Sequence, residues 1–510
     1  MTTGSQLRTE RRLHITGPSG HIPGPTNAIT IWRIPQDQDD CFRADLAADS
    51  PGTLHRIFSK VIDCEHRYDP FAGLQALSVP APWPSPLRAW YAVAGRVLAF
   101  IFSFVDRIVI ALLVEPIKAD LGVSDFGIGL LQGFAFALFY ALLGIPISRL
   151  SDRISRRSII ATGIVIWSLM TAACGLARSF FGLFLARVGV GVGEATLSPA
   201  AYSMISDYFP REKLGRAIGV YQSGALLGAG IAFLVGGAAI HLLAAWDGRV
   251  LPVLGVVRVW QLAFFAVGLP GLLVAMLMLT VQEPVRRGKA SGTATGIPLR
   301  QVLAYMNGHR RLFLAHFTGF ALLIVPITTV LAWAPTYLSR VLGFARADSG
   351  FTLGLMLLVL SPAAVYSGGW LIDLLQRRGY ADAPFRVSIG AAMALIPLSL
   401  FATTGTDPSL ALWLIGPLIF CACISQAAAP TVIQVMVPNE MRAQISAVWM
   451  LCMNLISTIA GPTMVGFITV YVLMDDMAVG QSIAIVNVLS APASALILWA
   501  GLKRFRLSQA

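Results

Sequence analysis

Twelve apolar runs of about 20 residues each follow one another between residues 91 and 502, separated by short polar loops. A helix of about 20 residues crosses the roughly 30 Å hydrocarbon core of a bilayer. Only helices and closed barrels span that core, because lipid offers backbone N–H and C=O groups no hydrogen-bond partner. Barrel strands would alternate apolar and polar residues, and these runs do not. The runs therefore predict an all-α integral membrane protein with twelve transmembrane helices.

Composition argues against a soluble protein. Hydrophobic residues make up 56% of the 510 residues and charged residues only 13%, far from the average of soluble domains. The net charge of +12 does not indicate a nucleic-acid partner, because the basic residues lie in loops between the apolar runs. The six cysteines show no metal-binding spacing. We therefore expect no cofactor, no bound metal and no nucleic acid.

The basic residues also predict an orientation. Lys and Arg are concentrated in the loops after the even-numbered runs and in the C-terminal tail. Loops rich in Lys and Arg stay on the cytoplasmic side of a membrane. We therefore expect a multi-pass, monomeric protein of a cell membrane, in a bacterium the inner membrane, with both termini in the cytoplasm.

The two halves of the chain repeat each other weakly. LSDRISRRS follows the second run and LIDLLQRRG the eighth, while FPREKLGRAIG follows the fourth and VPNEMRAQISA the tenth. Matched pairs of this kind indicate duplicated six-helix halves, between which transporters bind their substrates. The expected domains are a cytoplasmic N-terminal extension (1–88), an N-terminal six-helix bundle (89–280), a cytoplasmic linker with an interfacial helix (281–311), a C-terminal six-helix bundle (312–503) and a cytoplasmic tail (504–510).

The N-terminal extension and the linker differ from the bundles. The composition of residues 1–88 predicts disorder, and a start site further downstream is an open alternative. In the linker, Leu299, Val302, Leu303 and Met306 fall on one face of a helix, which predicts a helix lying in the headgroups.

Two of the apolar runs carry opposite charges deep inside them. Arg187 and Glu194, in the fourth run, are seven residues apart, so both project from nearly the same helix face, about 10 Å apart along the axis. Asp106 and Arg107 lie in the first run. A charge at mid-bilayer costs about 2.5–3.5 kcal/mol on insertion scales, so such residues normally line a bundle interior or a cavity. A static ion-pair cluster is the alternative, although buried pairs are poor net stabilisers.

Two stretches resemble a known family. SRLSDRISRR resembles the signature of the major facilitator superfamily between helices 2 and 3, although both signature glycines are serines here, Ser148 and Ser155. Asp106 and Arg107, together with Glu194, resemble the spinster-like family within that superfamily. The resemblance implies two six-helix bundles that move in alternating access. It also implies that Asp106 and Glu194 take part in proton coupling.

The loop after the second run is predicted to act as a cytoplasmic latch. Its carboxylate would cap a helix N-terminus, and its arginines would bind acidic partners while the protein faces outward. Charges that only set the topology are the alternative. The predicted gate residues are Asp152, Arg153, Arg156, Arg157 and, in the second half, Asp373.

Polar groups inside the apolar runs are candidates for the cargo site. Protonating one of the two acids would leave a guanidinium unpaired, which favours an anionic ligand group. The apolar lining would come from Phe134, Phe136, Phe139 and Trp333. Hydrogen bonding between helices or an interfacial belt is the alternative. The predicted substrate-binding residues are Arg107, Arg187, Gln132, Tyr140, Gln222, Trp333, Tyr337 and Asn454.

We predict a proton-coupled secondary active transporter that moves a small amphipathic or organic anion, lysolipid-like or organic-acid-like, by alternating access. A drug or sugar-acid permease is the alternative, and a transport-inactive membrane sensor is a further one. An enzyme is not expected, because no nucleophile or metal cluster accompanies the two acids. An ATP-driven pump is disfavoured by the lack of a GxxxxGK[ST] sequence. The expected partners are the substrate, protons and the bilayer.

Overall fold

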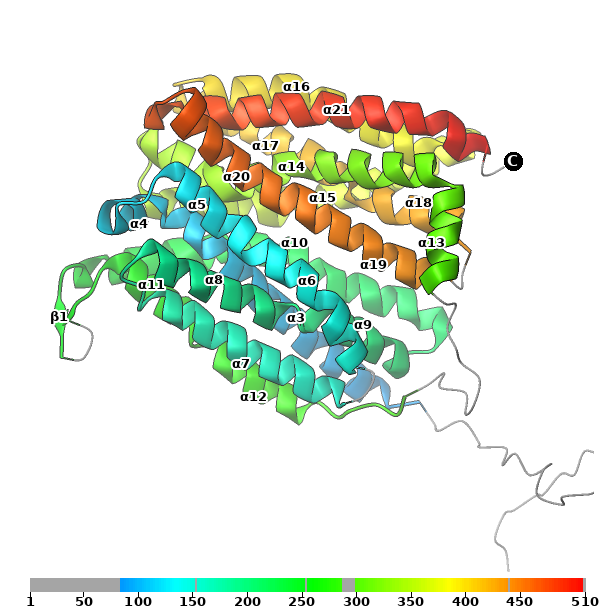
Figure 1. Cartoon of the computed structure of the whole chain (residues 1–510), viewed down its shortest axis with the longest axis horizontal. Coiled ribbons are helices and arrows are strands. Elements are labelled where there is room, and N and C mark those ends of the chain that lie inside the picture. Colours follow the sequence, from blue (N-terminus) through cyan, green and yellow to red (C-terminus); the bar gives the residue numbers. More distant parts are fainter. Residues whose placement is uncertain (1–82, 152–153, 253–254, 287–298, 439–440, 508–510) are drawn as a thin grey trace, which may run out of the picture. The chain divides into compact units, whose positions relative to one another are not determined.

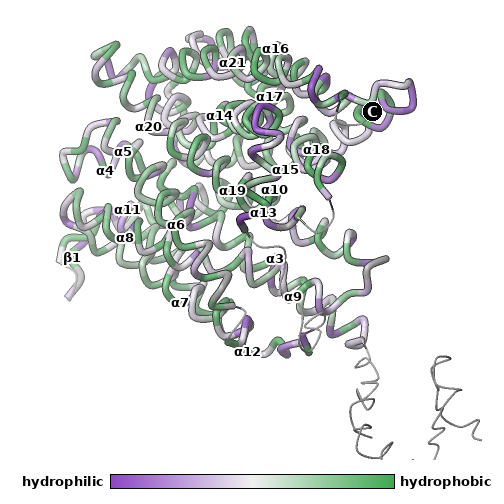
Figure 2. The backbone as a smooth tube through the Cα atoms, turned by 45° about the vertical axis from the view of Figure 1, so that its right-hand side comes forward, coloured by the Kyte–Doolittle hydropathy of each residue, from purple (hydrophilic) through white to green (hydrophobic). Residues whose placement is uncertain are grey.

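The computed structural model describes residues 83–151, 154–252, 255–286, 299–438 and 441–507. In these ranges eleven helices are long and apolar enough to cross a membrane, and a helix pair bent by 61° makes twelve if it counts as one span. Figure 2 shows hydrophobic residues along most helices, with hydrophilic residues mainly near the helix ends. The predicted fold class is confirmed.

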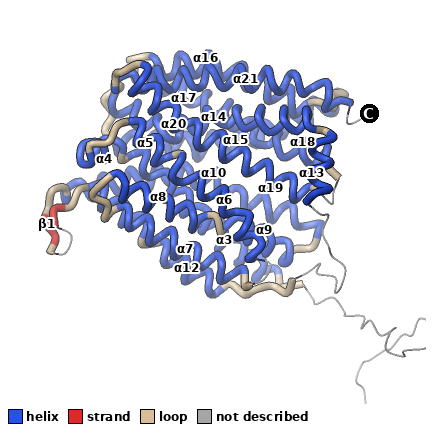
Figure 3. The backbone as a smooth tube through the Cα atoms, in the orientation of Figure 1, coloured by secondary structure: helices blue, strands red, loops and turns tan. Residues whose placement is uncertain are grey.

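Six spans form the N-terminal half (Figure 1). Several of them are interrupted, so one span holds two or three elements. A small antiparallel hairpin follows the fifth span, with Val250 paired to Val256 (Figure 3). The elements are α3 (Pro86–Ile108), η2 (Val109–Leu112), α4 (Val114–Leu121), α5 (Asp125–Gln132), α6 (Phe134–Ser151), α7 (Arg156–Cys174), α8 (Phe180–Glu194), α9 (Leu197–Tyr208), α10 (Arg211–Leu243), η3 (Ala244–Trp246), β1 (Val250–Leu251), β2 (Gly255–Val256), α11 (Val259–Gly268) and α12 (Gly271–Thr280).

The C-terminal half contains six further spans, preceded by a short helix inside the predicted linker. The eleventh span contains two π-helical segments, η5 and η6. The elements are α13 (Leu299–Gly308), α14 (Arg310–Arg340), α15 (Arg346–Arg377), α16 (Ala383–Thr404), α17 (Pro408–Ile424), η4 (Ser425–Ala427), α18 (Ala428–Met436), α19 (Arg442–Met453), η5 (Asn454–Ile459), α20 (Ala460–Phe467), η6 (Ile468–Val472), η7 (Asp476–Ala478) and α21 (Val479–Leu507).

Local sequence explains where several helices begin and end. The hydroxyls of Ser124, Ser155 and Ser179 each accept a hydrogen bond from the backbone N–H three residues ahead, so they cap α5, α7 and α8. Gly122 ends α4 with a φ of 62°, a left-handed conformation that glycine adopts without steric cost. Ser155 thus gives α7 a cap at a position where the family signature has glycine.

The spans alternate in direction, which defines two ends of the bundle. We call the end with Pro86 and Leu507 the termini end and the opposite end the distal end. In α13, near the termini end, Val302 is fully buried and Leu303 is half exposed. Tyr305 of the same helix donates a hydrogen bond to the carbonyl of Met436, 2.8 Å away. The helix therefore packs on the C-terminal half.

Two glycine-rich helix pairs join the halves, α10 with α15 and α5 with α20. A Cβ added to Gly354 would lie 2.9 Å from the carbonyl oxygen of Gly230, and one added to Gly129 would lie 2.7 Å from that of Pro462. Small residues let membrane helices approach this closely. Both contacts lie in the distal half of the bundle, so the halves touch backbone to backbone there.

Gly354→Val should push α15 away from α10 and favour a state that opens at the distal end. We expect several-fold faster labelling of a cysteine at Ala111, beside the cavity between the halves, by a reagent added at the distal side. Gly369→Val is the matched control, because a Cβ at Gly369, in the same helix, meets no atom within 4 Å. Equal labelling of the two variants would refute the role of this contact.

Candidate functional site

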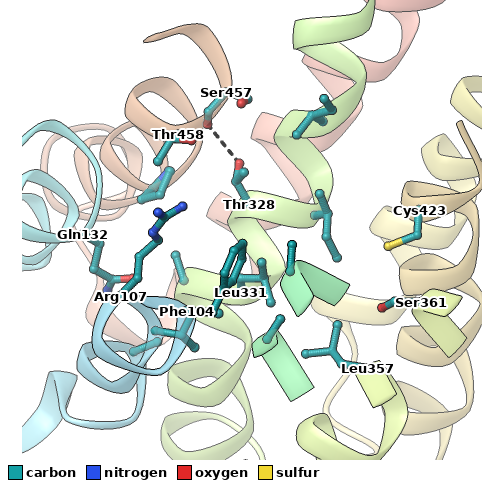
Figure 4. Close-up of a pocket in the computed structure, with 18 of the residues that line it drawn as sticks. Phe104, Arg107, Gln132, Thr328, Leu331, Leu357, Ser361, Cys423, Ser457 and Thr458 are labelled. Carbon is teal, nitrogen blue, oxygen red and sulfur yellow. Dashed lines mark hydrogen bonds between the residues drawn. The ribbon is translucent and has the colours of Figure 1, made fainter. Parts of the chain in front are cut away.

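A cavity of about 210 Å³ lies between the two halves, beside the glycine contacts (Figure 4). Side chains of α3, η2, α5 and α10 line it from one half, and those of α14, α15, α17, η4, α19, η5 and α20 from the other. Arg107 is the only charged side chain among the described lining residues. An intramembrane cavity with a single cation is suited to one anionic group.

The Arg107 guanidinium divides its donors between a buried acid and the cavity. Its Nη2 donates to Glu194 Oε2 over 2.6 Å, and the Ser103 hydroxyl donates to the same oxygen over 2.9 Å. The side chain of Arg107 is 19% exposed and that of Glu194 1%. The ring of Phe136 lies 4.2 Å from the guanidinium carbon. Arg107 Nε is buried and has no acceptor among the described residues, so the guanidinium is only partly satisfied.

The other two intramembrane charges do not pair through their side chains. Arg187 is fully buried and donates to the backbone carbonyls of Asp106, Arg107 and Leu131, at 3.0, 3.2 and 3.4 Å. It thereby satisfies carbonyls where α3 gives way to η2. Both carboxyl oxygens of Asp106 are buried and lack a hydrogen-bond partner among the described residues. Arg187 thus holds the backbone of the acid and leaves its carboxyl group free.

The predicted cargo residues fall into two groups. Arg107, Gln132 and Asn454 line the cavity. Arg187, Tyr140, Gln222, Trp333 and Tyr337 are not among the described residues that line it. Two of the latter hydrogen bond within the C-terminal half, Trp333 to the Pro462 carbonyl at 2.9 Å and Tyr337 to the Gly405 carbonyl at 2.7 Å. Lining residues that the sequence analysis did not select include Thr328, Ser361, Ser457 and Thr458.

None of the predicted aromatic residues is among the described residues that line the cavity. Phe136 is buried under Arg107, Trp333 is fully buried, and Phe134 is 37% exposed. The apolar part of the cavity is formed by Phe104 and by aliphatic side chains, among them Ile324 and Leu331 of α14.

At the termini end, Arg156 is the centre of an ion-pair cluster inside the N-terminal half. Its Nη1 donates to Asp207 over 2.5 Å and its Nε to Glu283 over 2.9 Å. The backbone N–H of Arg157 donates to Glu283 over 2.8 Å. Asp373 is exposed, and no ion pair joins it to another described residue. Asp152 and Arg153, also predicted for this gate, lie outside the described residues.

The arginines determine the acidity of Glu283. Partial burial alone would raise the pKa of this carboxyl, but hydrogen bonds from the Arg157 backbone and the Arg156 guanidinium outweigh burial and lower it below the ordinary 4.5. Glu283 and Asp207 were absent from the predicted gate. Glu283 directly follows the sixth span, and Asp207 lies at the end of the fourth. In the sequence, nothing distinguishes these two acids from other charges at span ends.

At the distal end, a second cluster connects the two halves. We call it the distal clasp (Glu115, Lys118, Asp125, Arg340 and Asp476). Arg340 of α14 binds both oxygens of Asp125, at 2.6 and 3.0 Å, and Glu115 at 2.6 Å. Lys118 binds Asp125 and Asp476, each at 2.7 Å. The Asp125 side chain is fully buried. Ion pairs in both directions thus join the two halves at this end: a cation of each half binds an acid of the other.

Comparisons with known proteins agree with this architecture. The family model described as Major Facilitator Superfamily matches residues 97–462. An MFS-type efflux pump of Mycolicibacterium smegmatis is 28% identical over 82% of this chain and 94% of its own length. A probable L-galactonate transporter of Escherichia coli is 26% identical over 72% of this chain and 81% of its own length.

Among solved structures, a bacterial homologue of the human lysosomal transporter Spinster, inward-facing and unoccupied, has a TM-score of 0.67 and 27% identity. The match covers 84% of this chain and 98% of that one. The resemblance to spinster-like proteins found in the sequence is therefore confirmed.

Glu283→Gln should remove an acid-sensitive part of the stability. A carboxyl whose pKa is lowered by folding stabilises the protein above the unfolded value near 4.5, and this contribution is lost as pH falls through the folded pKa. Near pH 7 the variant should therefore melt a few degrees below wild type, and this gap should shrink as pH falls below 4.5. Thermal unfolding in detergent measures this, with the exposed Asp348→Asn as control. A gap that stays constant across the acidic range would contradict the assignment.

Proposed function

This chain belongs to the Major Facilitator Superfamily, and from that premise we propose a proton-coupled transporter that carries a small organic or amphipathic anion by alternating access. The observation that carries the proposal is the division of Arg107 between Glu194 and the cavity. The family and the fold are those of membrane transporters rather than enzymes. The type of coupling and the cargo are the parts that we propose.

Alternating access is supported by the asymmetry of the contacts between the halves. The distal end carries the glycine contacts and the distal clasp, so it is closed there. The Arg156 cluster at the termini end ties α7, α9 and the segment after α12, all within one half. With both termini in the cytoplasm of a bacterial cell, as the loop charges predict, the described state faces inward. Transport requires the opposite state, in which the clasp is broken.

Proton coupling follows from the competition for one guanidinium. While Glu194 is ionised, it satisfies Arg107 at 2.6 Å. A proton on that carboxyl removes the negative charge and leaves Arg107 as an uncompensated cation beside the cavity. A carboxylate or phosphate of the cargo then takes its place, with charge-assisted hydrogen bonds from the guanidinium of Arg107. Proton and anion binding therefore help each other.

Asp106 is suited to hold a second proton. An ionised carboxylate that is buried without a partner is strongly disfavoured, and this carboxyl has none among the described residues. Its backbone carbonyl is tied to Arg187 at 3.0 Å. A movement of the helix end that brought either arginine to the carboxyl would favour release of the proton.

The lining supports an amphipathic cargo. Aliphatic side chains of α10 and α14 form one part of the lining, and amide and hydroxyl groups of α5, α14 and η5 form another. The printed names of the similar proteins include an efflux pump and a galactonate transporter. The similarity to a galactonate transporter favours a second candidate function, a permease for sugar acids, which are also organic anions.

Glu194→Gln should abolish uptake driven by a proton gradient while sparing exchange of labelled for unlabelled cargo, because the amide cannot cycle a proton. Flux into liposomes with and without an imposed gradient is the measurement. Asp348→Asn, which removes an exposed carboxylate outside the network, should behave as wild type. Undiminished gradient-driven uptake by Glu194→Gln would show that the ion pair is only a static packing element. Absence of any flux for wild type with every anion tried would favour a sensor.

A further inference from the structure

One buried group of the cavity is left unused by the anion site. Gln132 is 7% exposed, lines the cavity, and its Nε2 has no acceptor among the described residues. We propose that this amide recognises a hydroxyl group of the cargo, so that the transported anion is a small hydroxylated carboxylate. The inference rests on the proposed function and names the substrate class of the same site.

The position of Gln132 is fixed by the backbone. It is the last residue of α5, and the next residue, Gly133, separates α5 from α6. A Cβ at Gly133 would lie 2.8 Å from the carbonyl oxygen of Thr458, so the span is pressed against η5 at this point. Figure 4 shows Gln132 beside Arg107, with Thr328, Ser457 and Thr458 above them and Ser361 and Cys423 on the far side. A cargo whose carboxylate lies on Arg107 therefore has its next atoms near the amide.

The opposite wall supplies acceptors for a hydroxyl proton. Asn454 uses its Nδ2 to donate to the Met450 carbonyl at 2.9 Å, and no donor to its Oδ1 is found in the described ranges. The single proton of the Thr328 hydroxyl lies within reach of the Val325 carbonyl, at 2.8 Å, and of the Ser457 carbonyl, at 3.0 Å, and the hydroxyl oxygen can still accept a hydrogen bond. A π-helical segment such as η5 often marks a functional site.

These groups discriminate by chemistry. A hydroxyl group both donates and accepts hydrogen bonds, so cargo hydroxyls can accept from Gln132 Nε2 and donate to Asn454 Oδ1. An alkyl chain satisfies neither, and it would seal a buried donor away from water, which is costly. The volume of about 210 Å³ is below the roughly 300–1,000 Å³ of clefts that enclose drug-sized ligands. Both points favour a short hydroxylated acid over a lysolipid.

Binding of two matched six-carbon acids to the full-length protein tests the proposal. Gluconate and hexanoate share a carboxylate and a chain length and differ in their hydroxyl groups. We expect gluconate to bind wild type at least about tenfold more tightly than hexanoate, because one hydrogen bond to a buried group is of that order. Gln132→Met, which keeps the length and removes the amide, should weaken gluconate binding by about tenfold and leave hexanoate unchanged. Gln132→Asn, which keeps a shortened amide, should lie between them.

The outcomes separate this inference from the proposed function. If Gln132→Met leaves gluconate binding unchanged, or if hexanoate or a lysophosphatidate binds more tightly than gluconate, the hydroxylated class is wrong while the anion site stands. Arg107→Ala should weaken every anion that binds. If it weakens none of them, the anion site itself is wrong. A wild-type-like melting temperature of each variant shows that lost binding is not lost folding.

Discussion

A buried guanidinium with more donors than its one carboxylate partner can accept controls this structure. Arg107 keeps Glu194 at 2.6 Å, has a buried Nε without a described acceptor, and lines the cavity. A guanidinium whose donors were all paired would have none left for a ligand, and an arginine without any partner would be too costly to bury. In the proposed transport cycle, this partial satisfaction is what lets the pair respond to both a proton and an anion. Arg187, by contrast, donates its hydrogen bonds to backbone carbonyls and stabilises the end of α3.

The helix interruptions gather around this pair. α3 ends at Ile108, α5 at Gln132, α8 at Glu194 and α19 at Met453, and most of these ends border the cavity or the ion pair. Irregular backbone inside a membrane is tolerated only where protein or a cavity satisfies it. The breaks free carbonyls that Arg187 and Thr328 bind. The same irregularity therefore builds the site and requires the polar residues that maintain it.

Much of the architecture could be predicted from the sequence, and the site only partly. Hydrophobic length determined the spans, and charges inside them identified Arg107 and Glu194, because any charge in lipid needs a partner. Trp333 and Tyr337 were predicted as cavity residues, but each turns its polar atom to a carbonyl of its own half; sequence alone does not reveal the rotation of a helix. Arg340 and Asp125 lie at span ends, where charges normally only mark topology, so the distal clasp had no distinguishing pattern. The glycine contacts between the halves depend on which helices pack together, and the sequence of one helix does not show its partner.

The burial of Asp125 in the clasp has a thermal consequence. Its carboxylate is fully buried, between Arg340 and Lys118, so separating the halves must return these charges to water. Hydration of charged groups becomes less favourable as temperature rises, whereas direct attraction between them is retained. Opening at the distal end therefore becomes harder on warming and easier on cooling. The proposed exchange between the two faces is in this way dependent on temperature.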